Sequence, residues 1–292
     1  MFYSSGHNLF YLFSFPTLIL LYTHNHMNSI IIATDFSQAA QHAADYAAHL
    51  ATHLGASLHL FHAFSIPFTY TENPLPLISL DELTNISETE IASEKARLNT
   101  AFPNLALSHS VHPGEIMDCL AEAVESNDPL LVVVGSSGAG GNNLLWGSVA
   151  VQALRQLPVA VLAVPLHTSW KPVHSICLSA DYKHVNNHFP FEAIKKWVKT
   201  MQASLDVVHI SQSGVNATPD GVFQSELASV SPRYHTINNA KLGDGVAEFL
   251  KEHNPDWLLI IPQKHGFFES LFRRSRTEIL TKVSHVPVLA LH

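Results

Sequence analysis

The chain has 292 residues and a hydrophobic content of 47%, enough for two domains with buried cores, and this composition argues against global disorder. Its formal net charge of −8 argues against a general nucleic-acid binder. The two cysteines, Cys119 and Cys177, lie far apart and form no disulfide framework, which fits a reducing compartment such as the cytoplasm. The 20 histidines are scattered, a pattern more typical of a histidine-rich surface than of a metal site.

The first 26 residues form an apolar leader that differs in character from the rest of the chain. Pro16 interrupts the apolar run, and the leader contains no Lys or Arg. A membrane span needs about 20 predominantly apolar residues, and a signal peptide needs a positively charged start. We therefore expect the native chain to start at Met27 and residues 1–26 to lie outside the fold. An N-terminal membrane anchor is the alternative.

Apolar runs alternate with segments of helical spacing from residue 29 to residue 164. Strands are expected at Ser29–Ala33, Leu58–Phe64, Leu105–Val111, Leu130–Val134 and Pro158–Val164. Helices are expected from the cap Ser37 to Gly55, over Asp81–Ala101, around Ile116–Val124 after a turn at His112-Pro113-Gly114, and after Ser148 as a further cap. This order predicts a doubly wound, mostly parallel α/β sheet that binds its ligands at the carboxyl ends of its strands.

A glycine-rich segment, Gly135 to Ser148, joins the strand Leu130–Val134 to the next helix. Glycines let backbone N–H groups approach phosphate oxygens, and the first turn of a helix adds unpaired donors. The segment contains no Lys or Arg, so it is not a lysine-containing phosphate loop. A phosphate here would be held mainly by backbone amides, with Mg²⁺ as a candidate companion ion. A tight turn without a ligand is the alternative.

A second candidate position is Asp35, which follows the first expected strand. The carboxyl ends of parallel strands share one edge of a sheet, so Asp35 is expected on the same edge as the glycine-rich segment. Its carboxylate could bind the base or ribose of a nucleotide, or a metal ion. A purely structural turn aspartate is the alternative.

The pattern of the first half repeats after residue 172. The segments that correspond are Ile31–Phe36 and Cys177–Tyr182, Leu54–Leu58 and Met201–Leu205, Leu131–Val134 and Leu258–Ile261, and Leu157–Leu162 and Val286–Leu291. This duplication predicts two tandem doubly wound domains, at residues 27–166 and 173–292. The first carries 3 Lys/Arg and 13 Asp/Glu and the rest of the chain 13 and 11, so the two halves could attract each other.

The glycine-rich segment is not repeated in the second half. In this alignment Pro262 and His265 stand where Gly135 and Gly138 stand. Proline lacks an N–H group, so we expect the second domain to be a degenerate copy. Its cluster Arg273, Arg274 and Arg276 is interpreted as a solvated basic face or, alternatively, as a site for an anion or an acidic surface.

These motifs resemble the universal stress protein family in its tandem two-domain form. Nucleotide-binding members carry G-x-x-G, usually nine residues, and then G-[ST]; here eight residues separate Gly135-Ser136-Ser137-Gly138 from Gly147-Ser148. The small-Thr-Asp ending of the family's first strand is matched by Ala33-Thr34-Asp35, and its second-strand histidine with the following residue by His62-Ala63. Val134 and Val149 flank the loop as the family pattern expects.

The resemblance implies a Rossmann-like α/β fold of the adenine-nucleotide-binding type, with ATP, ADP or AMP as ligand. It places the base near Asp35 and Ala63 and the phosphates over Gly138, Gly147 and Ser148. The remaining nucleotide-site residues that it implies are Ala33, Thr34, Val134, Gly135 and Val149. It also implies a role in stress response, and pairing through the last strand, either as a pseudo-dimer within one chain or as a homodimer.

Three functions remain open at this point. The first is a cytoplasmic nucleotide-binding stress or regulatory protein with at most weak ATP hydrolysis, because no matched acid–base pair is evident. The second is an interaction protein of the same fold that binds no nucleotide, an alternative that the shortened loop leaves open. The third, an adenylating enzyme, ranks lowest because no glycines follow the first strand. Neither nucleic acid nor a membrane is expected as a partner.

Overall fold

The computed structural model describes residues 28–65, 79–136, 147–180, 189–211, 221–262 and 285–292. In its first half the strands are β1 (Ser29–Ala33), β2 (Ser57–Phe64), β3 (Leu107–Pro113), β4 (Leu131–Gly135) and β5 (Val161–Val164). The second half contributes β6 (Ser175–Ser179), β7 (Ser204–Ser211), β8 (Arg233–Asn238), β9 (Trp257–Ile260) and β10 (Val288–Ala290). The helices are α1 (Gln38–Leu54), α2 (Leu80–Ala101), α3 (Ile116–Asn127), α4 (Ser148–Gln156), α5 (Phe191–Met201), α6 (Gly221–Leu227) and α7 (Leu242–His253), and a 3-10 turn spans Ala228–Val230.

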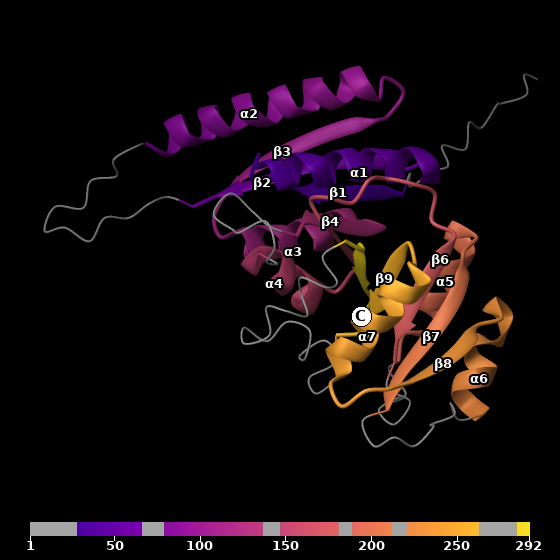
Figure 1. Cartoon of the computed structure of the whole chain (residues 1–292). Helices are drawn as coiled ribbons and strands as arrows, with labels where there is room; N and C mark the ends of the chain where they lie inside the picture. Colours follow the sequence, from indigo (N-terminus) through magenta and orange to yellow (C-terminus); the bar gives the residue numbers. More distant parts are fainter. Residues whose placement is uncertain (1–27, 66–78, 137–146, 181–188, 212–220, 263–284) are drawn as a thin grey trace, which may run out of the picture.

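The strands form one sheet of ten in the order β3-β2-β1-β4-β5-β10-β9-β6-β7-β8. Each half thus has the same internal order, and strands within a half pair in parallel. The halves meet where β5 and β10 run antiparallel, with Leu162 opposite Leu289. Figure 1 shows the indigo-to-magenta first half and the orange-to-yellow second half on either side of this junction. The structure confirms the tandem doubly wound fold.

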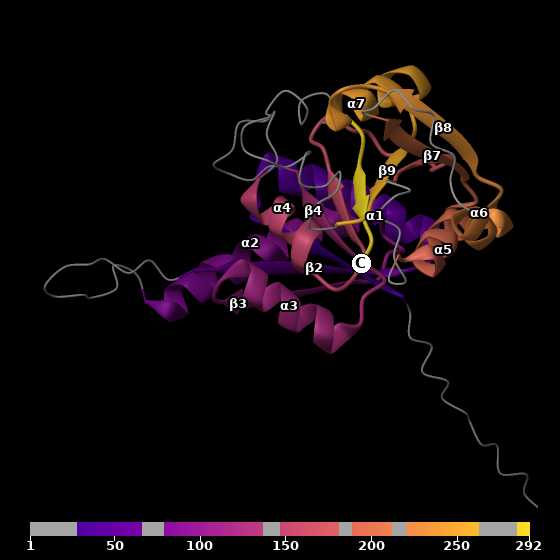
Figure 2. The ribbon, with the colours of Figure 1, turned by 90° about the horizontal axis from the view of Figure 1, so that it is seen from below.

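Helices cover both faces of the sheet, as a doubly wound fold requires. One buried cluster joins α1, α2, α5 and α6 to one face. A second cluster joins α3, α4 and α7 to the other. The views in Figures 1 and 2 agree that α2 lies beside the edge strand β3. Strands sandwiched in this way are apolar on both faces, which explains their continuous hydrophobic runs.

Helix α1 forms as the sequence predicts. The hydroxyl of Ser37 accepts a hydrogen bond from the N–H of Ala40 at the start of the helix. Gly55 ends it in the left-handed conformation, φ 63°, which costs glycine little. The buried face is rich in alanine, so the helix backbone lies close to the sheet. The start of α1 is therefore fixed at the strand end that carries Asp35.

Aromatic side chains connect the two halves. The indole N–H of Trp257, on β9, donates to the hydroxyl of Tyr46, on α1, at 2.8 Å, and both side chains are buried. Trp170, in the segment between the halves, packs edge-on against Tyr46 and stacks on His49. Burial raises the pKa of the Tyr46 hydroxyl. The first helix of one half is thereby fixed to a central strand of the other.

An ion pair fixes the segment between the two halves where this segment leads into β6. Nζ of Lys171 lies 2.6 Å from Oδ1 of Asp256, and Oδ2 of the same carboxylate accepts the backbone N–H groups of His174 and Ser175. Burial alone would raise the pKa of Asp256, but these positive and donor groups hold it below its usual range. The carboxylate therefore stays ionised at neutral pH and orders the chain that enters the second half.

The structure corrects several details of the sequence interpretation, including the start of the fifth strand, which is Val161 rather than Pro158. His112 and Pro113, expected in a turn, belong to β3, and the turn begins at Gly114. Strand pairing also shifts the alignment of the halves: Val132 pairs with Ile31 and Leu258 with Cys177, so Leu258 corresponds to Val132. It follows that Ile261, rather than Pro262, stands where Gly135 stands. The apolar runs are long enough to slide against each other, and only the pairing fixes their register.

Some of the expected features lie outside the described residues. These are the leader of residues 1–26, Gly138, Asp181, His265 and the arginines at 273, 274 and 276. Among the helices that the structure does describe, none combines the length and hydropathy needed to span a membrane.

Candidate functional site

The chain turns sharply where β1 ends. Thr34 is buried and Asp35 is exposed. Phe36 adopts a left-handed conformation, φ 61°, which is uncommon for a residue with a side chain. The Thr34 hydroxyl accepts the N–H of Phe36 at 3.0 Å, and the Asp35 carboxylate accepts that of Ser37 at 3.1 Å. Two side chains thus fix this turn and hold Asp35 at the surface.

Strand β2 supports the turn from one side. The N–H of Thr34 donates to the carbonyl of Phe61 at 2.9 Å, and Nδ1 of His62 lies 2.8 Å from the carbonyl oxygen of Thr34. Because a carbonyl can only accept, Nδ1 of His62 carries the proton. The ring of His62 packs against Phe36 at 4.5 Å. Ala63 follows and is half-buried at the strand end.

Strand β4 approaches the same edge from the other side. A Cβ added at Gly135 would lie 3.0 Å from the carbonyl oxygen of Ala39 and 3.1 Å from its carbon, at the start of α1. The glycine therefore lets β4 contact the α1 backbone directly. Val134, one residue earlier, is buried beneath it. The absence of a side chain at Gly135 serves this packing, a contact that no sequence pattern indicated.

The strand end and the next helix are joined across the glycine-rich segment. The N–H of Gly147 donates to the carbonyl of Ser136 at 2.6 Å, and the N–H of Ser136 donates to that of Val164 at 2.9 Å. The start of α4 is therefore held against the end of β4 even though the segment between them lies outside the described residues.

The expected N-cap at Ser148 is wrong by one residue. Gly147 is the N-cap, with extended backbone at φ −67° and ψ 156°, and as a glycine it offers no side chain to cap the helix. Ser148 is the first helical residue, and its side chain is exposed. Val149 follows, half-buried. Because a glycine N-cap has no side-chain acceptor of its own, the first backbone N–H groups of such a helix can bind an anion.

These elements meet at the switch point of the first half. The order β3-β2-β1-β4-β5 reverses direction between β1 and β4, and ligands of doubly wound sheets bind outside the carboxyl ends at such a point. Nine of the ten predicted site residues are described, and they lie on these three strand ends and the α4 start: Ala33, Thr34, Asp35, Ala63, Val134, Gly135, Gly147, Ser148 and Val149.

Sequence reasoning missed a polar row beside this edge. His112 on β3 pairs in register with Ala63. Its Nε2 lies 2.9 Å from the hydroxyl of Ser110, which also lies 2.8 Å from Nε2 of His59. Burial, and then the charge of His112, lower the pKa of His59. The spacing of alternate polar residues along β3 was the available signal for this row.

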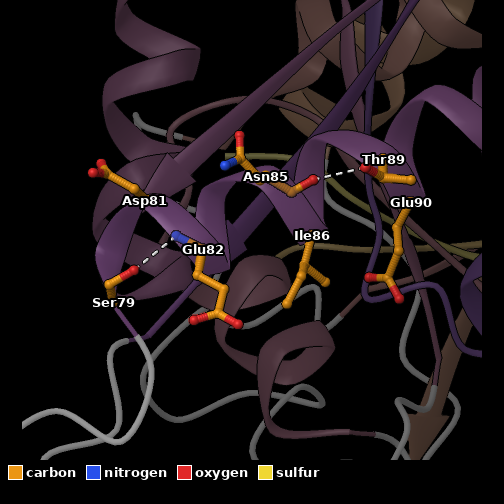
Figure 3. Close-up of a pocket in the computed structure, with 7 residues that line it drawn as sticks. All are labelled: Ser79, Asp81, Glu82, Asn85, Ile86, Thr89 and Glu90. Atoms are coloured by element: carbon orange, nitrogen blue, oxygen red, sulfur yellow. Dashed lines mark hydrogen bonds between the residues drawn. The ribbon is translucent and has the colours of Figure 1, made fainter.

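The described residues provide no metal site, and the hollow along α2 does not suit a phosphate. Within the described ranges no group of three His, Cys, Asp or Glu side chains is placed to bind a metal ion. A shallow hollow of about 560 Å³ runs along the outer face of α2, between Ser79 and Glu90 (Figure 3). Its charged side chains, Asp81, Glu82 and Glu90, are all acidic, so it does not suit a phosphate.

Comparison with known proteins identifies the fold unit that carries the site. The model of the universal stress protein family matches residues 27–165. The first half of this chain is a universal stress protein domain. The matched range contains every residue of the predicted nucleotide site, from Ala33 to Val149. A search of curated proteins found no match to the chain.

Solved structures extend the likeness to both halves. A universal stress protein from Archaeoglobus fulgidus is 17% identical over 91% of this chain and 98% of its own, with a TM-score of 0.67. A protein of unknown function from Pseudomonas aeruginosa is 11% identical over 91% and 92%, with a TM-score of 0.55. These likenesses establish the tandem fold. A universal stress protein from Arabidopsis thaliana, solved with AMP bound, is 14% identical over 47% of this chain and 90% of its own, with a TM-score of 0.32.

Proposed function

We propose that the first half binds an adenine nucleotide at the carboxyl ends of β1, β2 and β4, and that the protein acts in stress response or regulation through this binding. The observation that carries the proposal is the convergence of three features at one switch point. They are the rigid turn holding Asp35, the small residue Ala63, and the α4 start, whose N-cap Gly147 has no side chain.

Each part suits one part of a nucleotide. The Asp35 carboxylate is exposed beside a strand end and can accept hydrogen bonds from an adenine amino group or a ribose hydroxyl. Ala63 leaves room for the flat face of a base. Gly147, Ser148 and Val149 start a helix whose N–H groups favour phosphate, and we assign Gly138 to the same phosphate contact. Mg²⁺ would reach the site with the phosphates.

The packing residues around these groups make the site rigid. Val134 is buried, Gly135 contacts the start of α1, and Ala33 and Thr34 are fixed in the sheet by the pairing of β1 with β2. The site binds by backbone amides and one carboxylate, and we assign no catalytic residue to it. We further propose that residues 173–292 are a degenerate copy that stabilises the first domain as an intrachain pseudo-dimer.

The test is nucleotide titration of the chain from Met27 and of Asp35 variants. Mass spectrometry first identifies any nucleotide that copurifies, and calorimetry then measures ATP, ADP and AMP with Mg²⁺ or with a chelator. Asp35→Ala should weaken affinity by about tenfold, because one or two hydrogen bonds at roughly 1 kcal/mol each are lost. Asp35→Asn keeps an acceptor for the Ser37 N–H, so an equal loss in this variant assigns the effect to the ligand contact.

Asp81→Ala is the matched control. It removes the same charge from the same half, at the hollow along α2 (Figure 3), and should leave affinity unchanged. A folded protein with no copurified nucleotide and no heat on titration would reject the proposal in favour of an interaction protein of the same fold. Unchanged affinity in Asp35→Ala would show that the base lies elsewhere.

A further inference from the structure

Equivalent hydrogen bonds fix which residues of the two halves correspond. Nδ1 of His62 donates to the carbonyl of Thr34 at 2.8 Å, and Nδ1 of His209 lies 3.3 Å from the carbonyl of Ala180. Strand pairing agrees, since Ala33 is opposite Phe61 in one half and Ser179 opposite Val208 in the other. His209 therefore corresponds to His62. The residue after each histidine corresponds too, so Ile210 stands where Ala63 stands.

The helix that follows the next strand can be matched in the same way. The N–H of Gly114 donates to Phe64, and the N–H of Asn239 donates to Ser211, the residue equivalent to Phe64. Helices α3 and α7 both contain 12 residues and end in left-handed caps. In their first turns the N–H of Cys119 donates to Glu115 and that of Gly245 to Lys241, both at 3.1 Å. Asn239 thus corresponds to Gly114, and Gly245 to Cys119.

Side-chain volume is exchanged between these corresponding positions. In the first half the helix carries the larger residue: a Cβ added at Gly114 would lie 2.9 Å from Sγ of Cys119. In the second half the helix carries glycine instead. A Cβ added at Gly245 would lie 2.9 Å from Cδ1 of Ile210 and 3.1 Å from Cβ of Asn239. In the first half the larger residue, Cys119, is on the helix and the turn has Gly114. In the second half the helix has Gly245, and the larger residues are Ile210 at the strand end and Asn239 in the turn.

Because of this exchange, the Ile210 side chain fills the space at the strand end of the second half that Ala63 leaves open in the first half. Ile210 is 5% exposed and belongs to the core beneath α7, whereas Ala63 is half-buried at the edge. The isoleucine side chain rests on the helix backbone, which only glycine permits at this distance. A base cannot stack where Ile210 lies unless the side chain leaves the core and loses its apolar burial.

We propose that Ile210 fills the base position of the second half, so that each chain holds a single adenine nucleotide, and that the size of the residue after the second-strand histidine decides which half can accept a base. The part that concerns the first half rests on the function proposed above. The part that concerns the second half rests on the Ile210–Gly245 contact and on the correspondence of Ile210 with Ala63.

Photoaffinity labelling separates the two parts. The full chain from Met27 is labelled with 8-azidoadenosine triphosphate, and the labelled peptides are mapped by mass spectrometry. Label confined to residues 27–166 supports both proposals. Label within residues 173–292 that excess ATP displaces overturns the inference, whatever the first half does. Absence of label from both halves counts against nucleotide binding by the first half and agrees with a closed second half.

A transplant tests the size rule in the first half. Ala63→Ile with Cys119→Gly reproduces the Ile210–Gly245 pair, and affinity for ATP should fall about 10-fold or more, because a filled pocket excludes the base. Cys119→Gly alone is the matched control and should bind as the wild type does. In both variants Cys177 is the sole cysteine; it is fully buried, so its thiol reacts only on unfolding and reports that the fold is intact. Wild-type affinity in the folded double variant would overturn the rule.

Discussion

Gly135→Ala tests the close contact between β4 and the start of α1. The new methyl carbon would lie 3.0 Å from the carbonyl oxygen of Ala39, 3.1 Å from its carbon and 3.3 Å from the nitrogen of Ala40. Comfortable contacts between non-bonded carbon atoms lie near 3.5–4.0 Å. All three neighbours are backbone atoms, so neither side can yield by rotating a side chain. The strand end and the helix start must separate by a few tenths of an ångström, and overpacking of this kind costs about 1–3 kcal/mol.

Urea unfolding followed by tryptophan fluorescence measures this cost. We expect the midpoint of Gly135→Ala to fall while the slope stays unchanged, because the native fold is strained but not lost. Nucleotide affinity should fall as well, since the shift moves the α1 start and the Asp35 turn relative to α4. The two losses together would mark the contact as one that positions the proposed site.

Gly221→Ala is the control for the same substitution. Among the residues that the structure describes, a Cβ at Gly221 meets no atom within 4 Å, and Gly221 is the first residue of α6. Its stability should be unchanged or higher by up to about 1 kcal/mol, because alanine favours a helix. If Gly135→Ala unfolds at the same midpoint as Gly221→Ala, the contact with Ala39 is looser than described and the reasoning fails.

Two further predictions concern stability. Tyr46→Phe removes the acceptor of the buried Trp257 N–H and should lower the free energy of unfolding by about 1–3 kcal/mol; an unchanged urea midpoint would show that the bond contributes nothing. Burial alone would raise the pKa of Asp206, but hydrogen bonds from Arg233 and His235 hold it below its usual range. Its stabilisation is therefore full at neutral pH and is lost as the pH falls below about 4. Asp206→Asn should be less stable at pH 7 and flatter in acid, and an equally steep acid dependence would refute the assignment.

Local patterns were sufficient to predict the elements of the first half. Ser37 and Gly55 delimit α1 as expected, because capping depends on residues within one turn of each other. Strand β1 has the predicted bounds, since its apolar run ends abruptly at Thr34. The placement of Asp35 and the glycine-rich segment at one sheet edge followed from the alternation of strands and helices, whereas Ala63 was implied by the family resemblance.

Contacts between distant segments could not be predicted. The left-handed backbone at Phe36 is held by Thr34 and His62. It could not be predicted, because this position has no glycine, the residue that usually adopts such a conformation. The role of Gly135 depends on Ala39, almost a hundred residues earlier. The sequence also does not define the pairing register within uninterrupted apolar runs, so the alignment of Pro262 with Gly135 was wrong by one residue. Each of these is decided by a partner that the local sequence does not contain.

The antiparallel contact between β5 and β10 has a consequence for the order of folding. Residues 288–290 lie at the middle of the ten-stranded sheet, yet they are translated after every other described strand. Until they emerge from the ribosome, β5 and β9 each present an open edge of unpaired N–H and C=O groups. Completion of the sheet is thus a late pairing step of high contact order, and the nascent chain exposes two unpaired strand edges until residues 288–290 are available.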